Sequence, residues 1–198
     1  FGFNGGSTLA LDTRVPGILV NTVIGGAAGI VGGIAIGWWQ RGHCEVGYLI
    51  NGAIAGLVAI TANCHVVSPL AALVIGLVAS ALMVWASELL LAWRLDDAVG
   101  AIPAHLVPGI WGTLSVGLFG DLALIDNGNT RIAQFGVQLL GVVACALWSC
   151  ATAWLLLRCI GRFGPLRVRP EDEHMGLNVS EHGTRTDLIE LVDAMEMH

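Results

Sequence analysis

The chain has 198 residues, of which 55% are hydrophobic and only 12% are charged, and its formal net charge is −6. Soluble domains are about one quarter charged, so this composition excludes an ordinary soluble domain and favours a membrane protein. Every basic residue is an arginine, and the acidic balance excludes the basic surface that nucleic-acid binding requires.

The chain begins with the short segment FGFNGGS, in which an aromatic pair precedes Asn-Gly-Gly-Ser. This pattern is typical of the last turn of a helix and of the loop that follows it. We therefore expect the segment to end a helix whose earlier residues precede the sequence. On this interpretation the chain is the C-terminal part of a longer protein.

Four long stretches without Asp, Glu, Lys or Arg follow, at 15–40, 46–87, 98–120 and 132–157. A helix that crosses the hydrocarbon core needs about 20 apolar residues, because the core is about 30 Å thick. The second stretch is long enough for two crossings, and NCHVVSP near its middle predicts a turn. The sequence thus predicts an all-α polytopic membrane protein with five transmembrane helices, at about 17–39, 47–64, 69–92, 98–119 and 134–160.

The arginines are unequally distributed over the two sides that five crossings define. One side holds Arg14 and Arg131, and the other holds Arg41, Arg94, Arg158, Arg162, Arg167 and Arg169. The positive-inside rule places the second side, with the C-terminus, in the cytoplasm. We therefore expect a multi-pass protein of the plasma membrane, the inner membrane of a bacterium. Glu88 lies near this cytoplasmic boundary and is expected to snorkel or to be locally paired.

Small residues predict close helix packing. Gly25, Gly29, Gly33 and Gly37 are spaced four apart, and Gly52 and Gly56 repeat the spacing in the next helix. Lipid gives helices no hydrophobic reason to associate, so small residues that let backbones approach supply much of the contact energy. The five cysteines form no CxxC pair. We expect them to pack as small residues, without metal or redox chemistry, and no cofactor is predicted.

His105 is the candidate functional residue, because it stands in the uncharged stretch within DDAVGAIPAHLVPGIWGTL. One interpretation is a structural hydrogen bond to a neighbouring helix, and the other is a site in a transport path, where an imidazole can carry a proton. Pro103 and Pro108 each remove a backbone donor, and such breaks are tolerated where a cavity compensates. They favour a lined cavity, whereas His43 and His65 are expected to be solvated loop residues.

After Gly161 the sequence becomes polar and charged. We therefore expect a membrane domain at 1–162 and a cytosolic tail at 163–198. The tail continues into a second helical pattern after Thr184, with apolar residues at Leu188, Leu191, Val192 and Met195. This amphipathic helix would pack on the same protein or lead to another domain. The membrane stretches contain no paired carboxylates and no nucleophile beside a base, so the protein is not expected to be an enzyme.

Four segments carry a resemblance to a known family, in the family's order and spacing. They are FGFNGGS, NGAIAGLVAITANC, DDAVGAIPAHLVPGIWGTLSVGLFG and PLRVRPEDEHMGLNVSEHG, and together they cover essentially residues 1–183. In them the chain resembles the ammonium transporters of the ammonium transporter, methylammonium permease and Rhesus group. The resemblance implies the end of family helix six through helix eleven, a homotrimer with one pore in each subunit, and a cytoplasmic C-terminus.

The resemblance also implies roles for individual residues. His105 matches the second of two histidines that line the apolar pore, and its partner belongs to a helix outside this chain. Phe3 matches a phenylalanine that closes the outer mouth, and Ser7 matches a hydroxyl of the outer ammonium recruitment site. Around the histidine the family commonly has VHG where this chain has AHL.

Two functions follow as alternatives. The first is an ammonium transporter that recruits ammonium at an outer aromatic site, deprotonates it and passes it through the histidine-lined pore. The second is an ammonium sensor with a transporter-like membrane domain joined to a cytosolic signalling domain, because the tail runs on as TRTDLIELVDAMEMH. The implied partners are ammonium or ammonia, further copies of the chain, membrane lipid, and at the tail a PII-type regulatory protein or a fused signalling domain.

Overall fold

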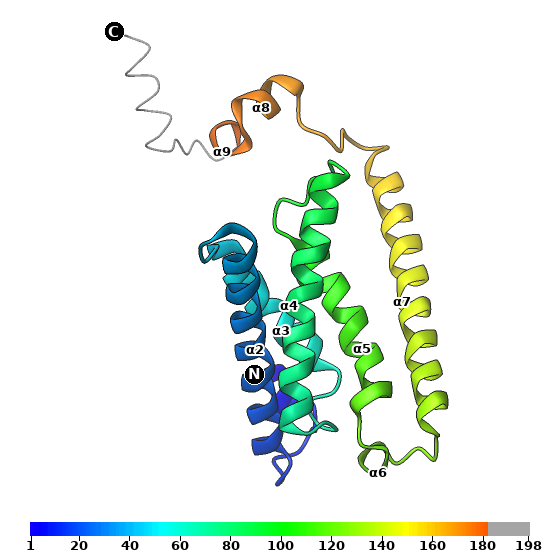
Figure 1. Ribbon diagram of the computed structural model, residues 1–198. Helices are drawn as coiled ribbons and strands as arrows, with labels where there is room; N and C mark the ends of the chain where they lie inside the picture. Colours follow the sequence, from blue (N-terminus) through cyan, green and yellow to red (C-terminus); the bar gives the residue numbers. More distant parts are fainter. Residues whose placement is uncertain (182–198) are drawn as a thin grey trace. The chain divides into compact units, whose positions relative to one another are not determined.

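The computed structural model describes residues 1–181, and every regular element in that range is a helix (Figure 1). The elements in chain order are α1 (Gly2–Gly6), α2 (Val15–Arg41), α3 (Val46–Thr61), α4 (Pro69–Ala92), the π-helical η1 (Ile102–Leu106), α5 (Val107–Phe119), α6 (Leu122–Ile125), α7 (Arg131–Ile160), α8 (Pro170–Met175) and α9 (Leu177–Ser180). The contacts of the chain divide it into two units, one from Phe1 to Cys145 and one that begins at Ala146, and α7 runs through both.

Four helical segments are long and apolar enough to cross a membrane: α2, α4, the segment Ile102–Phe119 and α7. They correspond to four of the five predicted crossings, and α4 has the predicted bounds. The fifth predicted crossing, 47–64, forms the shorter apolar helix α3 of 16 residues. At about 1.5 Å per residue, α3 spans about 24 Å, less than the thickness of the hydrocarbon core.

Helix α3 ends early because the residues after Thr61 turn instead of continuing the helix. The amide of Asn63 donates to the carbonyl of Ile60 at 3.1 Å, and the amide of Val66 donates to the carbonyl of Asn63 at 2.9 Å. The next helix begins with Ser68 as its N-cap, whose side chain accepts from the amide of Ala71. The segment expected to turn therefore does so, but it begins two residues before Cys64, the predicted end of the helix.

The two predicted glycine rows pack against each other. A Cβ atom at Gly29 would overlap the carbonyl oxygen of Gly52, and one at Gly56 would overlap the carbonyl oxygen of Gly25. The backbones of α2 and α3 therefore touch along this line, as the small-residue pattern predicts. Gly76 brings α4 equally close to Gly25, so three helices meet at the same small residues.

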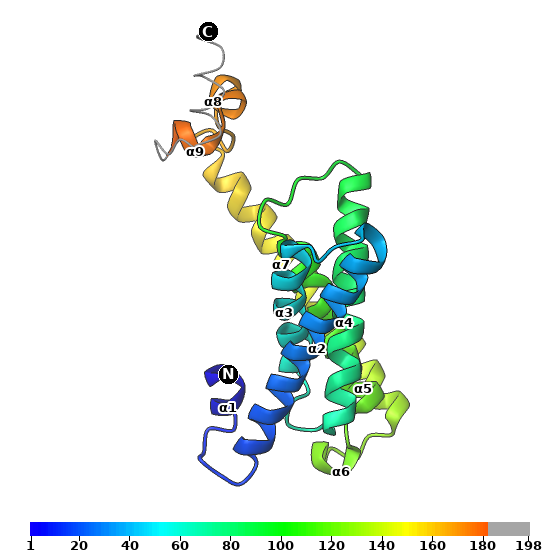
Figure 2. The ribbon, with the colours of Figure 1, turned by 60° about the vertical axis from the view of Figure 1, so that its left-hand side comes forward.

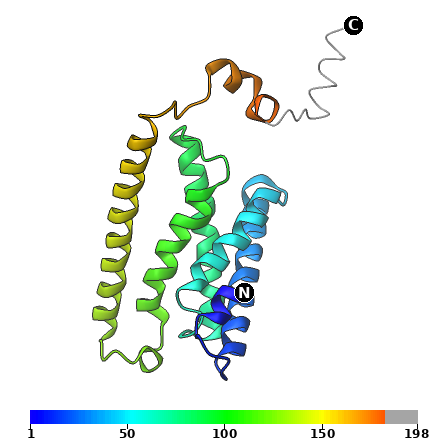
Figure 3. The ribbon, with the colours of Figure 1, turned by 180° about the vertical axis from the view of Figure 1, so that it is seen from behind.

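The first unit is a group of antiparallel helices whose course can be followed from both sides (Figures 1 and 3). Helices α2, α3 and α4 pack on one another, and α5 packs against α3 and α4. The largest fully buried apolar side chains are Ile60, Ile75, Met83, Val66 and Val84. Helix α1 lies against the beginning of α2 (Figure 2), where Asn4 Nδ2 donates to Thr22 Oγ1 at 3.1 Å.

The second unit contains the later part of α7 with α8 and α9. The Arg158 guanidinium lies over the Trp154 ring at 4.6 Å, and Arg167 pairs with Glu173 at 3.1 Å. The helix predicted after Thr184 lies outside the described residues. All five cysteines are free, and Cys64 alone is fully buried, so the packing role expected for them applies to that residue.

Candidate functional site

His105 lies in a turn of π-helix at the start of the helical segment Ile102–Phe119. The amide of Val107 donates to the carbonyl of Ile102, five residues earlier, and this is the spacing of a π-turn. Pro108 has no amide hydrogen, and its ring would clash with the carbonyl of Ala104 in regular α geometry. The wider turn removes that conflict, and π-turns inside helices are found frequently at functional sites.

His105 is exposed on the surface of the first unit, among apolar neighbours that are also exposed. Ile102 is 39% exposed, Leu106 is 53% exposed and Ile110 is 37% exposed. Within residues 1–181, the structure records no hydrogen bond of the His105 ring, so it gives no support to a structural bond with a neighbouring helix. The His105 imidazole therefore lies on an apolar face that the described residues leave uncovered.

Ser7 lines a cavity of about 320 Å³ at the opposite end of α3 from Glu45. The lining residues are Asn4, Ser7, Thr8, Arg14, Ile18, Thr61, Cys64 and His65. The Ser7 hydroxyl donates to the carbonyl of Phe3 at 2.5 Å, which leaves its oxygen able to accept a hydrogen bond. The Phe3 side chain is 77% exposed and does not line this cavity.

His65 is a residue whose place in this cavity the sequence did not predict. Its ring is exposed, as expected for a loop histidine, yet it lines the same cavity as Ser7. Partial burial, and then the positive charge of Arg14, lower the pKa of His65. Burial raises the pKa of the neighbouring Cys64 thiol. Arg14 is itself held by Asp12, with the two side chains 2.6 Å apart.

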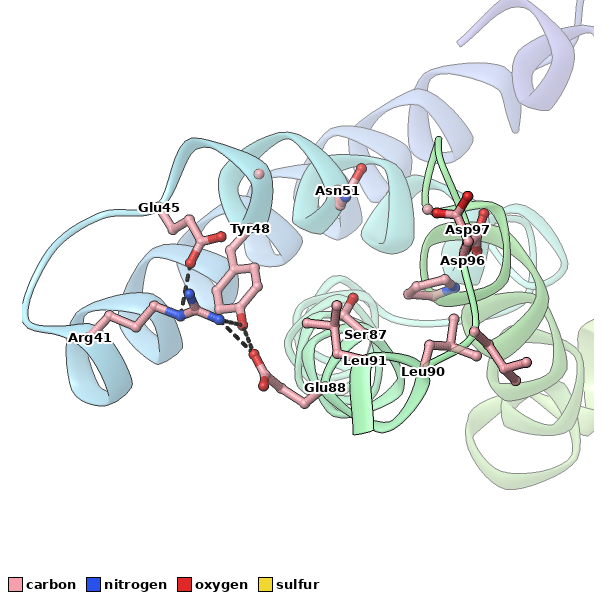
Figure 4. Close-up of a pocket in the computed structure, with 14 residues that line it drawn as sticks. Arg41, Glu45, Tyr48, Asn51, Ser87, Glu88, Leu90, Leu91, Asp96 and Asp97 are labelled. Carbon is pink, nitrogen blue, oxygen red and sulfur yellow. Dashed lines mark hydrogen bonds and ion pairs between the residues drawn. The ribbon is translucent and has the colours of Figure 1, made fainter. Parts of the chain in front are cut away.

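A second cavity, of about 270 Å³, lies at the end of the first unit that contains Arg41 (Figure 4). Arg41 pairs with Glu88 at 2.8 Å and with Glu45 at 3.0 Å, and its guanidinium lies 5.4 Å from the centre of the Tyr48 ring. The Tyr48 hydroxyl donates to the same Glu88 oxygen at 2.5 Å. Glu88 is thus locally paired, one of the two arrangements that the sequence predicts.

Asp97 also lines this cavity, and its carboxylate accepts hydrogen bonds from the backbone amides of Ala101 and Ile102.

Two buried asparagines were missed by the sequence analysis. Asn21 Nδ2 donates to the carbonyls of Cys64 at 2.9 Å and Val67 at 2.8 Å. Asn63, which is 0% exposed, links the end of α3 to α5. Asn21 could have been noticed as an amide inside an uncharged apolar helix, but nothing in the sequence indicates its partners.

The structure does not bring the predicted site residues into one place. Phe3 and Ser7 are one helical turn apart, whereas His105 lines neither of the two cavities just described. Within residues 1–181, no three His, Cys, Asp or Glu side chains are grouped so that they could hold a metal ion.

Comparison with known proteins identifies the family. The sequence profile of the Ammonium Transporter Family matches residues 1–187. A putative ammonium transporter of Synechocystis sp., sll0537, is 48% identical over 98% of this chain, and Ammonium transporter Amt2 of Archaeoglobus fulgidus is 40% identical over 92%. The chain spans 36% and 41% of the lengths of these two relatives.

Solved structures agree. A protein named Sensor Amt Protein superposes with a TM-score of 0.84 at 37% identity, covering 91% of this chain and 45% of that protein. Mep2 of Candida albicans gives a TM-score of 0.77 at 30% identity, covering 86% and 40%. Four helical segments of membrane-spanning length and these relatives make the protein a membrane protein, from a family of transporters rather than of enzymes. The chain belongs to the Ammonium Transporter Family.

Proposed function

We propose that the protein to which this chain belongs carries ammonium across a membrane, and that His105 lines the path. The observation that carries the proposal is the place of His105, an imidazole on a π-turn within an uncovered apolar face. The chain spans less than half the length of its relatives, and segments outside these 198 residues would cover that face and close the pore. The relatives named as ammonium transporters support the substrate.

Acid–base chemistry explains how such a path could select ammonium over potassium. The two ions are similar in size, but only ammonium can donate hydrogen bonds and lose a proton. An apolar pore is prohibitive for an ion that must stay charged, because burial without compensation is costly. An imidazole in the wall of the path can accept a hydrogen bond or relay a proton, so ammonia can pass where potassium cannot.

The cavity beside Ser7 suits the first contact with ammonium. The Ser7 oxygen keeps a free lone pair, because its hydrogen is donated to the Phe3 carbonyl. The exposed Phe3 ring offers an aromatic face, and a cation over such a face gains about 0.5–2 kcal/mol. We assign Ser7 to recruitment and Phe3 to the gate at the outer mouth.

The proposal includes an orientation and an assembly. Of the eight arginines up to Arg169, six lie on the side of the membrane on which α2 ends. By the positive-inside rule that side faces the cytoplasm, and so does the tail at 163–198. The membrane is the bacterial inner membrane on this proposal. Residues 1–162 form the membrane domain on this proposal. The protein assembles as a homotrimer, and the tail receives a PII-type regulator or continues into a signalling domain.

The test replaces His105 by alanine in the full-length protein and measures ammonium uptake and the ratio of ammonium to potassium permeation. Proton relays contribute at least about a hundredfold to many reactions, so uptake should fall by at least about tenfold and selectivity should weaken. His43→Ala is the matched control, because His43 lies in an exposed loop. Unchanged uptake and unchanged selectivity in His105→Ala would refute the proposal.

A sensor is the second candidate, and the likeness to the solved structure named Sensor Amt Protein favours it. A sensor would bind ammonium through the Ser7 cavity without appreciable flux. Measuring ammonium binding and ammonium flux on the same purified protein separates the two functions. The gene sequence after His198 gives a further check, since a kinase or cyclase domain there supports sensing and a stop codon supports transport.

A further inference from the structure

Asn63 makes a buried link between two helices of the first unit. Its Nδ2 donates to Ser115 Oγ at 2.6 Å, to the Gly112 carbonyl at 3.0 Å and to the Ala59 carbonyl at 3.2 Å. An amide nitrogen has two hydrogens, so one of them is shared between two acceptors. Ser115 Oγ in turn donates to the Gly112 carbonyl at 2.8 Å, which closes a small network between α3 and α5.

The link lies where the two backbones touch. A Cβ atom at Gly112 would overlap the carbonyl oxygen of Ala59, so α5 cannot come closer to α3 at this point. Asn63 and Ser115 are both 0% exposed. The contact and the hydrogen bonds together fix the position of α5 along the axis of α3 and the rotation of α5 about its own axis.

Stability alone explains this asparagine poorly. Its Oδ1 is buried and has no hydrogen-bond partner within residues 1–181. An unpaired buried oxygen is unfavourable, and an apolar residue of similar volume would avoid it. Such a replacement would, however, lose the hydrogen bonds that the Asn63 side chain donates to Gly112 and Ser115 of α5.

The helical segment that Asn63 holds is the one that carries His105. Gly112 follows His105 by seven residues, about 10 Å along the helix, and it is buried against α3 whereas His105 is exposed. The π-turn that carries His105 packs against α3 and α4, and it continues directly into α5, so contacts of α5 with α3 act on the same helical segment. A different anchor, Trp111 Nε1 to the Ile75 carbonyl at 3.1 Å, holds α5 to α4 and not to α3.

We propose that Asn63 is a positioning residue that sets the depth and rotation of His105 by fixing α5 to the end of α3. The inference rests on the proposed role of His105 in the path. Without Asn63 the Trp111 anchor would still hold α5 in the folded unit, but α5 could slide or rotate against α3. A displacement of about 1 Å is enough to lower a rate by about a hundredfold.

The experiment uses Asn63→Leu in the full-length protein, with Thr113→Val as the matched control. Thr113 lies on the same helix, but its hydroxyl donates to the Gly109 carbonyl of that helix, and among residues 1–181 no hydrogen bond from it reaches another helix. Per folded protein, Asn63→Leu should lower the maximal ammonium flux by about tenfold and leave the half-saturating concentration within about twofold, because recruitment is separate. The ratio of ammonium to potassium permeation should fall, and Thr113→Val should retain wild-type values.

A double variant separates positioning from a general structural effect. If Asn63 acts through His105, Asn63→Leu should not change the permeation ratio further in a His105→Ala background. Wild-type flux in Asn63→Leu, or an equal loss in both backgrounds, would overturn the inference. If His105→Ala itself has no effect, the proposed function fails; if it has one and Asn63→Leu behaves like Thr113→Val, only this inference fails. Should Asn63→Leu not fold, Ser115→Ala, which removes one acceptor, is judged by the same criteria.

Discussion

Arg41 at the end of α2 and Glu88 near the end of α4 form an ion pair at 2.8 Å, although 47 positions separate them in the sequence. Tyr48 of α3 donates to the same carboxylate, so one acidic group holds the ends of three helices (Figure 4). The pair lies at the boundary where an apolar helix meets polar groups, and it makes an ionised carboxylate acceptable there.

A double-mutant cycle tests this pair. Arg41→Ala and Glu88→Ala should each lower the melting temperature, and the double variant should lose less than the sum of the two losses, because either single variant already removes the ion pair between them. The pair Arg167 and Glu173 is the control, since its side chains are 83% and 57% exposed and such pairs contribute almost nothing. Additive losses at Arg41 and Glu88 would show that the ion pair contributes no coupling.

The contact between the glycine rows can be tested with a single methyl group. Gly29→Ala should destabilise the protein by about 1–3 kcal/mol, because the new Cβ would overlap the Gly52 carbonyl and force α2 and α3 apart. Gly17→Ala is the control on the same helix, because a Cβ there meets nothing within 4 Å. Thermal unfolding should show no loss for Gly17→Ala, and similar curves for both variants would contradict the close contact.

Asn21 should matter for the loop between α3 and α4. Asn21→Ala leaves the carbonyls of Cys64 and Val67 without their donor, and each buried group left unpaired costs about 1–3 kcal/mol. Thermal unfolding should therefore show a clear loss, whereas Gln40→Ala at the exposed end of the same helix should be neutral. Equal melting temperatures for the two variants would mean that the hydrogen bonds from Asn21 do not stabilise the loop between α3 and α4.

Arg131 caps the C-terminal end of α5 by hydrogen bonds to its last carbonyl groups. Its guanidinium donates to the carbonyls of Gly117, Leu118 and Gly120, at 3.2, 2.8 and 3.0 Å. Arg131→Met should cost about 2 kcal/mol, because charged donors to carbonyls are worth more than neutral ones. Arg131→Lys should recover only part of the loss, since an ammonium group lacks the planar fork. Full recovery by lysine would show that charge alone acts there, and unfolding curves distinguish the cases.

The lowered pKa of His65 predicts how stability depends on pH. The unfolded chain takes up a proton on this ring at a higher pH than the folded protein does, so stability falls as pH drops below about 6.5. His65→Gln should remove this part of the acid sensitivity and leave stability above that pH unchanged. The effect should be small because the ring is exposed. Melting temperatures of both proteins between pH 5 and 8 check it, and parallel curves would contradict it.

The sequence predicted the membrane helices well because uncharged length is a local property. The bounds of α4 agree residue by residue, and α2 and α7 extend the predictions by only two or three residues at an end. Helix α3 was predicted too long because the chain turns after Thr61, where the backbone amide of Asn63 donates to the carbonyl of Ile60. The Asn63 side chain then bonds to α5. The local pattern NCHVVSP predicted the turn, but not the contact of Asn63 with a residue 49 positions away.

The candidate site was predicted only in part. The prolines beside His105 indicated a broken helix, and the structure has a π-turn there. His65 was expected to be solvated only, yet it shares a cavity with Ser7, because the end of α3 returns to the region where α1 ends. No property of the NCHVVSP segment could indicate that cavity.

By itself, the sequence determined which segments are apolar helices, where small residues allow close packing, and that an imidazole stands on an otherwise apolar helix. These follow from composition and spacing along one chain segment. Only the tertiary structure decided that the row at Gly29 meets Gly52, that Arg41 finds Glu88, and that Asn63 holds α5. The physical reason is that hydrogen bonds and backbone contacts act over a few ångströms, so their partners are set by how helices distant in sequence come together.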